Sequence, residues 1–538
     1  MSIETPFPHL TCTSAAPLQR DVRRVYQHIF KSRLAAGTVR PVVAPYHYYG
    51  IVLLFVYLCI PHTKSPLVYA ARWPVLAAIV HFQWKELCET SSGSTDIAYY
   101  AGVASAWLMV LSATWLVWCR PQFEARRLNR RRRTAVVVVG GAEKGAAEGK
   151  ASGNAVAGDK GLKQRRGVTG EWLYYWQPYP DNLRERIPWV FDLLSNYRGV
   201  GWNWAITKVP DIPLPIKQQL GDPIDHNRPK GGSHRYFTTR RAHFKHHFPR
   251  FIVLYLLLDA SKTIGAKDPY YAFGPNTYAL PPYLQNLSPL TLYAYRWALS
   301  SFATVVSLNL LFSLGALVAV VLLGPRVLGP TFEPWCFPEA WGSLADIYDG
   351  GLAGFWGSWW HQSFRFAFSA PTNFLARKGY LDPRSTTTRV LALFVGFGLS
   401  GFVHAGGSLT QQSHTYPWHS ALFFLVQPLG ILLEQAFCSR FRSGIARLPR
   451  FVRRVGNAAY TTIWFLCTAP MLQNDSARGG MFLFEPLPLS PTKGLGFGLP
   501  DEGWWYLDSY LSRGEIPLWY QGKHWWQSGV RVDAFTTL

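Results

Sequence analysis

Eight apolar segments are distributed along this 538-residue chain, and they constrain its fold more than any other feature. Several fall short of the ~20 residues that an ordinary membrane-spanning helix needs. The composition agrees with embedding in a bilayer, since 49% of the residues are hydrophobic and only 16% are charged. We therefore predict an all-α, polytopic membrane protein with about seven to nine transmembrane helices. The apolar segments cover residues 46–60, 67–82, 99–119, 251–260, 299–324, 390–409, 418–438 and 458–471.

The formal net charge of +23 is carried by loops between these segments rather than by one soluble face. This distribution fits the positive-inside rule and argues against a nucleic-acid partner. From Arg120 to Arg166, 13 lysines and arginines stand against 4 acidic residues. We predict that the loop 120–168 is cytosolic and disordered, because its Gly/Ala/Lys-rich part cannot bury a core. A basic cluster from Arg440 to Arg454 falls on the same predicted side, whereas the basic residues before position 41 do not, so the N-terminal orientation stays open.

Motifs for metals, phosphates and nucleophilic serines are missing from the sequence. The seven cysteines are scattered without CxxC spacing, which argues against a disulfide framework or a zinc site. His243, His246 and His247 could ligate a metal, but no carboxylate or cysteine has matching spacing, and a basic interfacial patch is the favoured interpretation. We predict no metal and no permanently bound cofactor.

His404 lies inside the apolar segment 390–409, where an ionisable side chain is costly and is a functional hypothesis by default. In a helix it shares a face with Ser400 and Gly401. These small residues, with Gly406 and Gly407, either admit a neighbouring helix closely or form a channel wall for a ligand. A neutral imidazole suits general-base catalysis of acyl transfer to an alcohol. The alternative is a histidine that only packs against another helix.

His361 follows a run of aromatic residues, Phe355-Trp356-Gly357-Ser358-Trp359-Trp360, in a loop before the His404 segment. It is the second catalytic candidate. An interfacial anchoring role is the alternative, because aromatic residues gather at membrane surfaces. Arg365, one turn later, could meet a phosphate or carboxylate, or lipid headgroups.

Three sequence elements together resemble the wax synthase-like branch of the membrane-bound O-acyltransferases, as found in fungi. The elements are Trp341-Gly342-Ser343-Leu344 with Phe355-Trp356-Gly357 and Trp360-His361-Gln362, then Ser400-Gly401-Phe402-Val403-His404, and earlier Arg198-Gly199-Val200-Gly201-Trp202-Asn203-Trp204. The strong likeness covers residues 334–407, and the first 170 residues and the tail contribute little.

The resemblance implies helices around an internal tunnel in which acyl-CoA, as co-substrate, meets a hydroxyl acceptor. It implies His404 as general base and leaves the role of His361 open among polarising the thioester, stabilising the oxyanion and orienting the donor. Arg198, Trp202 and Asn203 are candidates for donor contact or for local folding. The expected substrate-binding residues are Trp360, Gln362, Arg365, Ser400, Gly401, Arg198, Trp202 and Asn203.

The function expected on these grounds is transfer of an acetyl or long-chain acyl group to a terpenoid, polyketide or fatty alcohol. The partners are acyl-CoA, the hydrophobic alcohol and the bilayer, and the expected location is the endoplasmic reticulum. A multi-span transporter or channel is the alternative, although the sequence has no internal repeat. The chain divides into a basic N-terminal segment (1–41), N-terminal transmembrane helices (42–119), the basic loop (120–168), an interfacial segment (169–248), an acyltransferase core (249–472) and a tail (473–538).

Overall fold

The computed structural model describes residues 19–138, 164–221, 235–413, 415–500, 502–505 and 518–532. Within these residues the chain is mostly helical, and four helices are long and apolar enough to cross a membrane. They are Thr95–Trp118 (α5, Thr95–Ala113, extended by the π-helix η2, Thr114–Trp118), Pro289–Leu323 (α12, Pro289–Ala316, extended by the π-helix η3, Leu317–Leu323), α16 (Thr386–Leu409) and α17 (Pro417–Arg440). A shorter apolar helix, Tyr46–Cys59, comprises η1 (Tyr46–Tyr48) and α2 (Tyr49–Cys59).

The predicted count of seven to nine spans is therefore not confirmed. Two predicted segments lie inside longer helices, α9 (Arg240–Gly265) and α19 (Arg450–Arg478), which begin with clustered basic residues. These helices are long enough to cross a membrane, but they are not among the four that are also apolar enough. The predicted segment 67–82 is divided at Ala71 between α3 (Pro66–Ala70) and α4 (Arg72–Glu89).

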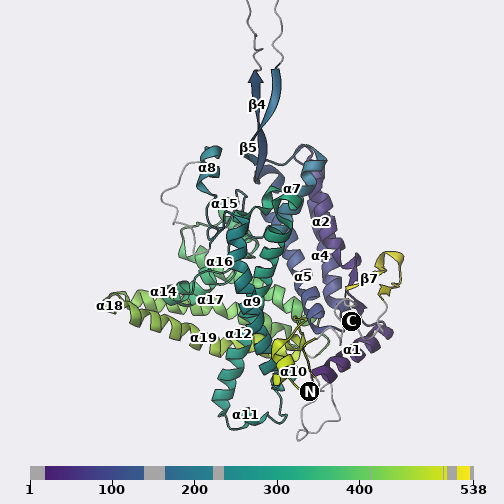
Figure 1. The fold of residues 1–538 in the computed structure, drawn as a ribbon, viewed down its shortest axis with the longest axis vertical. Helices are drawn as coiled ribbons and strands as arrows, with labels where there is room; N and C mark the ends of the chain where they lie inside the picture. The colour runs from purple at the N-terminus through teal and green to yellow at the C-terminus, as the bar shows by residue number, and fades with distance from the viewer. Residues whose placement is uncertain are drawn as a thin grey trace, which may run out of the picture.

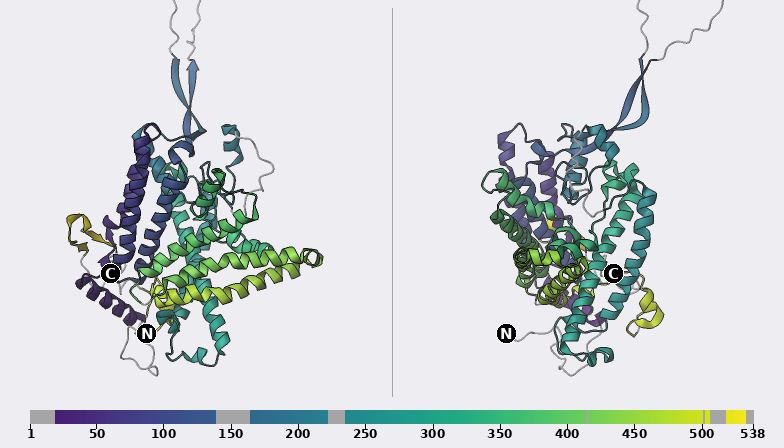
Figure 2. Two further views of the ribbon diagram at one scale, coloured as in Figure 1. Left: turned by 180° about the vertical axis from the view of Figure 1, so that it is seen from behind. Right: turned by 90° about the vertical axis from the view of Figure 1, so that its left-hand side faces the viewer.

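The helices run in two main directions. Figures 1 and 2 show α2, α4, α5 and α9 along the long axis of the molecule, while α17 and α19, joined by α18 (Arg442–Arg447), extend sideways as an arm. Helix α16 packs between α5 and α17, and α9 packs on α12. The further helices are α1 (Gln19–Ala35), α6 (Pro121–Glu124), α7 (Leu183–Ser195), α8 (Leu214–Leu220), α10 (Tyr270–Phe273), α11 (Pro282–Gln285), α13 (Gly324–Leu328), α14 (Leu344–Gly354) with η6 (Phe355–Trp359), and α15 (Arg365–Arg377).

Strands in the structure correct two predictions, the disorder of the loop 120–168 and the all-α fold. The hairpin of β4 (Arg127–Val138) and β5 (Gln164–Gln177) pairs antiparallel from Arg127 opposite Gln177, and it projects from one end of the helical body (Figure 1). The described flanks of the loop 120–168 are thus ordered, and residues 139–163 lie outside the described part. The loop is strongly basic, but its flanks contain β-branched and aromatic residues, which favour strands. The fold is also not purely α.

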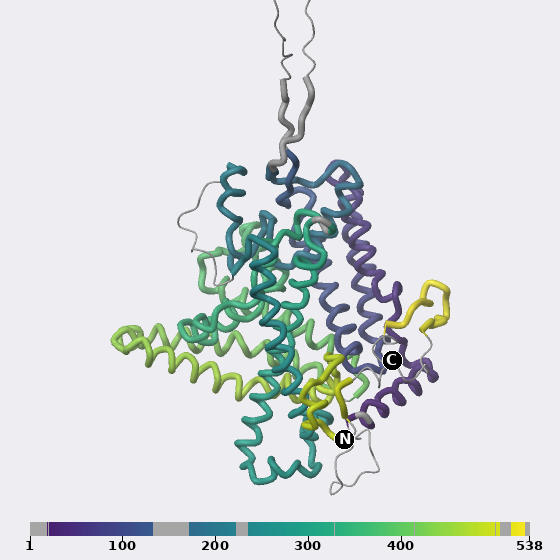
Figure 3. The backbone as a smooth tube through the Cα atoms, viewed as in Figure 1, coloured from purple at the N-terminus to yellow at the C-terminus, as the bar shows by residue number. Residues whose placement is uncertain are grey.

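Short strands and a buried charge network attach both ends of the described chain to the helices. Strand β1 (Arg40–Pro41) pairs with β3 (Thr90–Ser91), and β7 (Gly529–Arg531) lies between β2 (Val43–Ala44) and β6 (Trp519–Tyr520). This places the C-terminal segment beside α1 and α2 (Figure 3).

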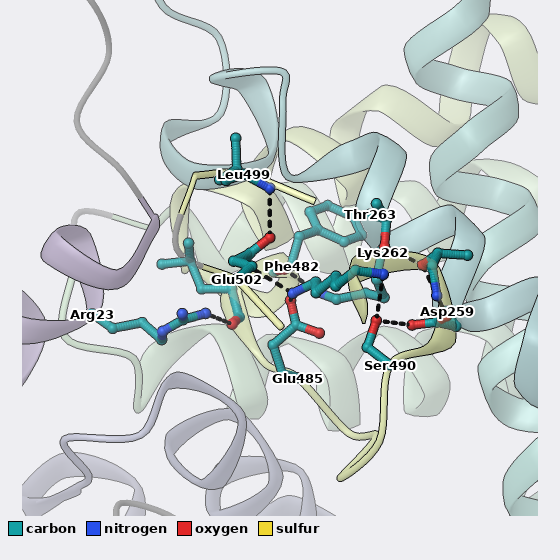
Figure 4. A network of polar contacts seen from close by, with 12 residues as sticks. Arg23, Asp259, Lys262, Thr263, Phe482, Glu485, Ser490, Leu499 and Glu502 are labelled. Carbon is teal, nitrogen blue, oxygen red and sulfur yellow. Dashed lines mark hydrogen bonds and ion pairs between the residues drawn. The ribbon is translucent and has the colours of Figure 1, made fainter. Parts of the chain in front are cut away.

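The charge network connects the tail to α9, through Lys262 and Asp259, and to α1, through Arg23. The Nζ of Lys493 donates to Glu485 at 3.1 Å and to Glu502 at 3.0 Å, and Arg23 of α1 donates to the carbonyl of Leu483 at 2.9 Å (Figure 4). Because these charges are paired, burying them beneath the tail does not leave the carboxylates or the ammonium unsatisfied.

Candidate active site

Helix α16 carries His404 in its last two turns. The helix begins where the side chain of Ser385 accepts a hydrogen bond from the backbone of Thr388, an ordinary N-cap. It continues through the apolar segment and ends at Leu409. His404 is therefore placed on a regular helix, as the sequence predicted.

The small residues of α16 admit neighbouring helices, which is the first of the two alternatives left open by the sequence. A Cβ on Gly102 of α5 would overlap the carbonyl oxygen of Gly406. On the other side, a Cβ on Gly401 would lie 2.9 Å from the carbonyl oxygen of Ala421 in α17. The backbones of three helices thus approach closely around the turn that carries His404.

The His404 ring has a polar contact on one side and an aromatic contact on the other. Its Nδ1 lies 2.9 Å from the hydroxyl oxygen of Tyr99 in α5, and its face stacks on Phe424 of α17 with ring centres 4.6 Å apart. The side chain is half-buried. No described residue forms a hydrogen bond with Nε2, so that nitrogen is available to a reactant.

Buried hydrogen bonds fix the end of α16 that follows His404. The carboxylate of Asp475 in α19 accepts from the hydroxyl of Ser408 at 2.6 Å and from the backbone of Tyr416 at 2.5 Å. Thr410 donates to the carbonyl of Ala98 in α5 at 2.6 Å. These bonds connect the end of α16 to α5 and α19, which limits movement of the catalytic candidate.

His361 is presented by a broken helix. Helix α14 is interrupted at Gly351, which has φ +58°, and restarts at Leu352. The side chain of Glu434 in α17 accepts hydrogen bonds from the backbone N–H groups of Leu352 at 2.9 Å and Ala353 at 3.0 Å. These amides are donors that a helix N-terminus leaves without intrahelical partners, so Glu434 caps the restarted helix leading to His361.

Two of the expected substrate-binding residues shape the turn around His361. The side-chain amide of Gln362 is buried and donates to the carbonyls of Trp356 at 3.1 Å and Trp360 at 2.5 Å. Arg365 donates to the carbonyl of Gly357 at 2.8 Å and to the Gln362 side chain at 2.7 Å. Their polar contacts in the structure therefore hold the turn.

The His361 ring lies in an aromatic shell. Its centre is 5.7 Å from that of Phe312, 5.9 Å from Trp341, 5.1 Å from Trp360 and 5.9 Å from Phe364. Among the described residues its buried Nδ1 has no hydrogen-bond partner. Burial, with smaller contributions from His404 and Arg198, lowers the pKa of His361 to about 3, so the ring is neutral at physiological pH.

Aromatic rings connect the two histidines. Phe424, stacked on His404, lies 6.1 Å from Trp356, which lies 5.7 Å from Trp360, the neighbour of His361. The influence of His404 on the pKa of His361 agrees with this proximity. The structure thus brings together His404, His361 and Trp360, whereas Ser400 is half-buried nearby on α16.

The residues of the Arg198–Trp204 element have partners within the protein. Arg198 donates to the carbonyls of Pro338 at 2.8 Å and Glu339 at 2.7 Å, just before Trp341. Trp202 donates to Asp192 at 3.0 Å. Asn203 donates to the carbonyl of Glu124 at 2.9 Å and accepts from the backbone of Arg126 at 2.9 Å. These contacts favour local folding over donor contact for Arg198, Trp202 and Asn203.

The histidine triplet of α9 does not form the interfacial patch expected from the sequence. His243 and His247 are buried, with ring centres 4.3 Å apart, and His246 lies 2.6 Å from the carboxylate of Glu339. Within the described ranges, no group of three or more His, Cys, Asp or Glu side chains is arranged to hold a metal ion.

Sequence reasoning missed Tyr99, Phe424, Phe312 and Glu434. Each lies on a different helix from the histidines, Tyr99 on α5, Phe312 on α12, and Phe424 and Glu434 on α17, and none belongs to a recognisable motif. Trp341 belonged to the family resemblance but was not among the candidate site residues, although its ring contacts His361.

Known proteins share sequence similarity with this chain. Residues 337–426, which include both histidines, match the Membrane bound O-acyl transferase family. Acetyltransferase spyB of Aspergillus fumigatus is 27% identical over 263 residues, which are 48% of this chain and 40% of that protein. Acetyltransferase atnC of Arthrinium sp is 28% identical over 328 residues, 59% of this chain and 68% of that protein. O-Mevalon transferase macI of Penicillium terrestre is 26% identical over 331 residues, 55% of this chain and 66% of that protein.

No solved structure shows a significant match to the chain. Two of these relatives are named acetyltransferases and one an O-Mevalon transferase. The matched family segment contains His361, in the loop after the capped, broken helix, and His404 on the glycine-packed helix. The segment that carries both histidines is therefore similar in sequence to the membrane-bound O-acyltransferase family.

Proposed function

We propose that this protein transfers an acyl group from acyl-CoA to the hydroxyl of a hydrophobic acceptor within the membrane, with His404 as general base. The observation that carries the proposal is the ring of His404, which is held by Tyr99 and Phe424 while its Nε2 has no partner among the described residues. A base in this setting can take the proton of an alcohol as the oxygen attacks, which typically accelerates such reactions by about 10²–10⁴.

His361 is proposed as the hydrogen-bond donor to the thioester oxygen. Its Nδ1 is buried without a described partner, so a proton there would be an unsatisfied donor. The tautomer with the proton on Nε2 avoids this cost. A neutral imidazole N–H can then stabilise the negative charge that develops on the thioester oxygen.

The proposed reaction is one direct transfer. The acceptor oxygen forms a bond to the acyl carbon as His404 Nε2 takes the hydroxyl proton. The carbon–sulfur bond then breaks, and the proton passes from Nε2 to the sulfur of the departing coenzyme A. The thioester is already activated, so these steps need no acyl-enzyme. The aromatic shell around His361 would limit competing water.

The relatives' names guide the choice of substrates. Two are acetyltransferases and one is an O-mevalon transferase, so we propose an acetyl or related short acyl donor and a hydroxylated secondary metabolite as acceptor. A wax synthase-like reaction with a long-chain donor and a fatty alcohol is the second choice within the same chemistry. We propose the endoplasmic reticulum membrane as its location.

The experiment that tests the proposal is a matrix of donors and acceptors. Membranes containing the protein are incubated with acetyl-CoA or a long-chain acyl-CoA against terpenoid, polyketide and fatty alcohols, and ester is measured by mass. We expect ester with at least one pair and none in membranes lacking the protein. Solute uptake by reconstituted vesicles, with no ester from any pair, would instead support the transporter alternative.

A further inference from the structure

Helix packing fixes the hydroxyl of Tyr99 beside His404. Tyr99 lies on α5, 305 positions earlier in the chain, and its ring is buried. Gly407 makes room for that ring, since a Cβ there would lie 2.7 Å from Tyr99 Cε2. The close approach of Gly102 to Gly406 holds the two helices together one turn away. The 2.9 Å contact between the hydroxyl oxygen and Nδ1 is therefore a consequence of how α5 and α16 pack.

The chemistry of a histidine base gives this contact a role, an inference that rests on the proposed function. Once His404 has taken a proton, both ring nitrogens carry hydrogen, and the Nδ1–H needs an acceptor. Among the described residues, Tyr99 is the hydrogen-bond partner of the ring. A charged N–H left without an acceptor in a buried site is costly, whereas a hydrogen bond to a charged group is among the stronger ones.

We propose that Tyr99 is a positioning residue whose hydroxyl oxygen accepts the Nδ1–H of His404. In the resting enzyme this bond keeps Nε2 unprotonated toward the reactants. During transfer it stabilises the imidazolium. Tyr99 keeps its own proton throughout, since the hydroxyl proton of the acceptor moves to Nε2 and then to the sulfur of coenzyme A.

The kinetic test compares Tyr99→Phe with Tyr100→Phe. Phenylalanine preserves the Tyr99 ring and removes only the hydroxyl, whereas Tyr100 is half exposed on the same helix and serves as the matched control. For Tyr99→Phe we expect kcat to fall by about 10- to 100-fold, the loss of a hydrogen bond to a charged group, with both KM values within about twofold of wild type. Wild-type kcat in Tyr99→Phe would overturn the proposal.

A second measurement determines the tautomer of His404 and does not require the enzyme to turn over. The full-length protein is labelled with ¹⁵N-histidine in detergent or nanodiscs, and the His404 signals are identified by their loss in His404→Gln. We expect the Nδ1–H tautomer in wild type and a mixture in Tyr99→Phe. The Nε2–H tautomer as the main wild-type form would overturn the proposal whatever the kinetics show. If wild type forms no ester with any pair, the proposed function fails while the tautomer is still measured.

Discussion

His404 and His361 share an aromatic neighbourhood but are held in different ways. His404 lies on a continuous helix and has a polar partner in Tyr99. His361 follows a broken helix, and its Nδ1 has no partner among the described residues. A hydrogen-bond partner that can accept from an imidazole stabilises its charged form, whereas an apolar aromatic shell disfavours it. This difference is the reason for proposing proton transfer at His404 and uncharged hydrogen-bond donation at His361.

The largest effect is expected at His404. His404→Ala removes the proposed base and should lower kcat by about 10²–10⁴, measured as the rate of ester formation at saturating substrates. His81→Ala, which changes an exposed histidine of α4, is the control and should retain wild-type activity. Comparable activity in both variants would remove His404 from the mechanism.

A smaller loss with a chemical signature is expected at His361. His361→Ala removes the proposed donor and should lower kcat by about 10²–10³, the usual cost of losing one oxyanion contact. His361→Gln retains an amide N–H and should recover part of this loss, because it can donate but cannot act as a base of similar strength. A glutamine variant no better than alanine would contradict donation and leave a packing role.

The cap on the broken helix should affect stability and activity together. Glu434→Ala leaves two helix N–H groups without their acceptor and should destabilise the fold by about 1–3 kcal/mol. Its thermal unfolding midpoint in detergent should fall, and kcat should fall because the segment carrying His361 loosens. Glu434→Gln keeps one acceptor oxygen and should lie between alanine and wild type. An unchanged midpoint in both variants would show that the cap contributes nothing.

The smallest expected effect is the contribution of His361 to the pH dependence of stability. The pKa of His361 is lowered from 6.5 to about 3 by burial, so the unfolded chain binds a proton at a higher pH than the folded chain does. The stability from the neutral ring is full above pH 6.5 and is lost as pH falls toward 3. We expect His361→Gln to flatten the thermal midpoint between pH 7 and 5, a window worth about 1–2 kcal/mol. Parallel profiles for wild type and variant would contradict a neutral, buried His361.

The sequence predicted the elements of the site better than their contacts. Position 404 was expected in a helix and position 361 in the loop before it, and both are confirmed. Apolar periodicity and glycine content are local, so they can be recognised in one segment. The partners are not local, since Tyr99 comes from α5 and Glu434 from α17.

Strand β4 and the full extent of α9 and α19 were not predicted, because one property of the sequence in each segment was more prominent than another. The basic charge of residues 120–138 concealed strand β4. In α9 and α19 the apolar core of each helix was visible, but its continuation through charged residues was not. The roles of Arg198, Trp202 and Asn203 depended on backbone carbonyls and side chains that only the folded chain brings near them.

The most direct test of His404 as a base compares acceptors of different acidity. A phenolic hydroxyl, with a pKa of about 10, needs less help from a base than an aliphatic hydroxyl does. With matched phenolic and aliphatic acceptors and one acyl-CoA, we predict that the loss of kcat in His404→Ala is much smaller for the phenol, while the loss in His361→Ala is similar for both. An equal loss for the two acceptors in His404→Ala would contradict general-base catalysis by this residue.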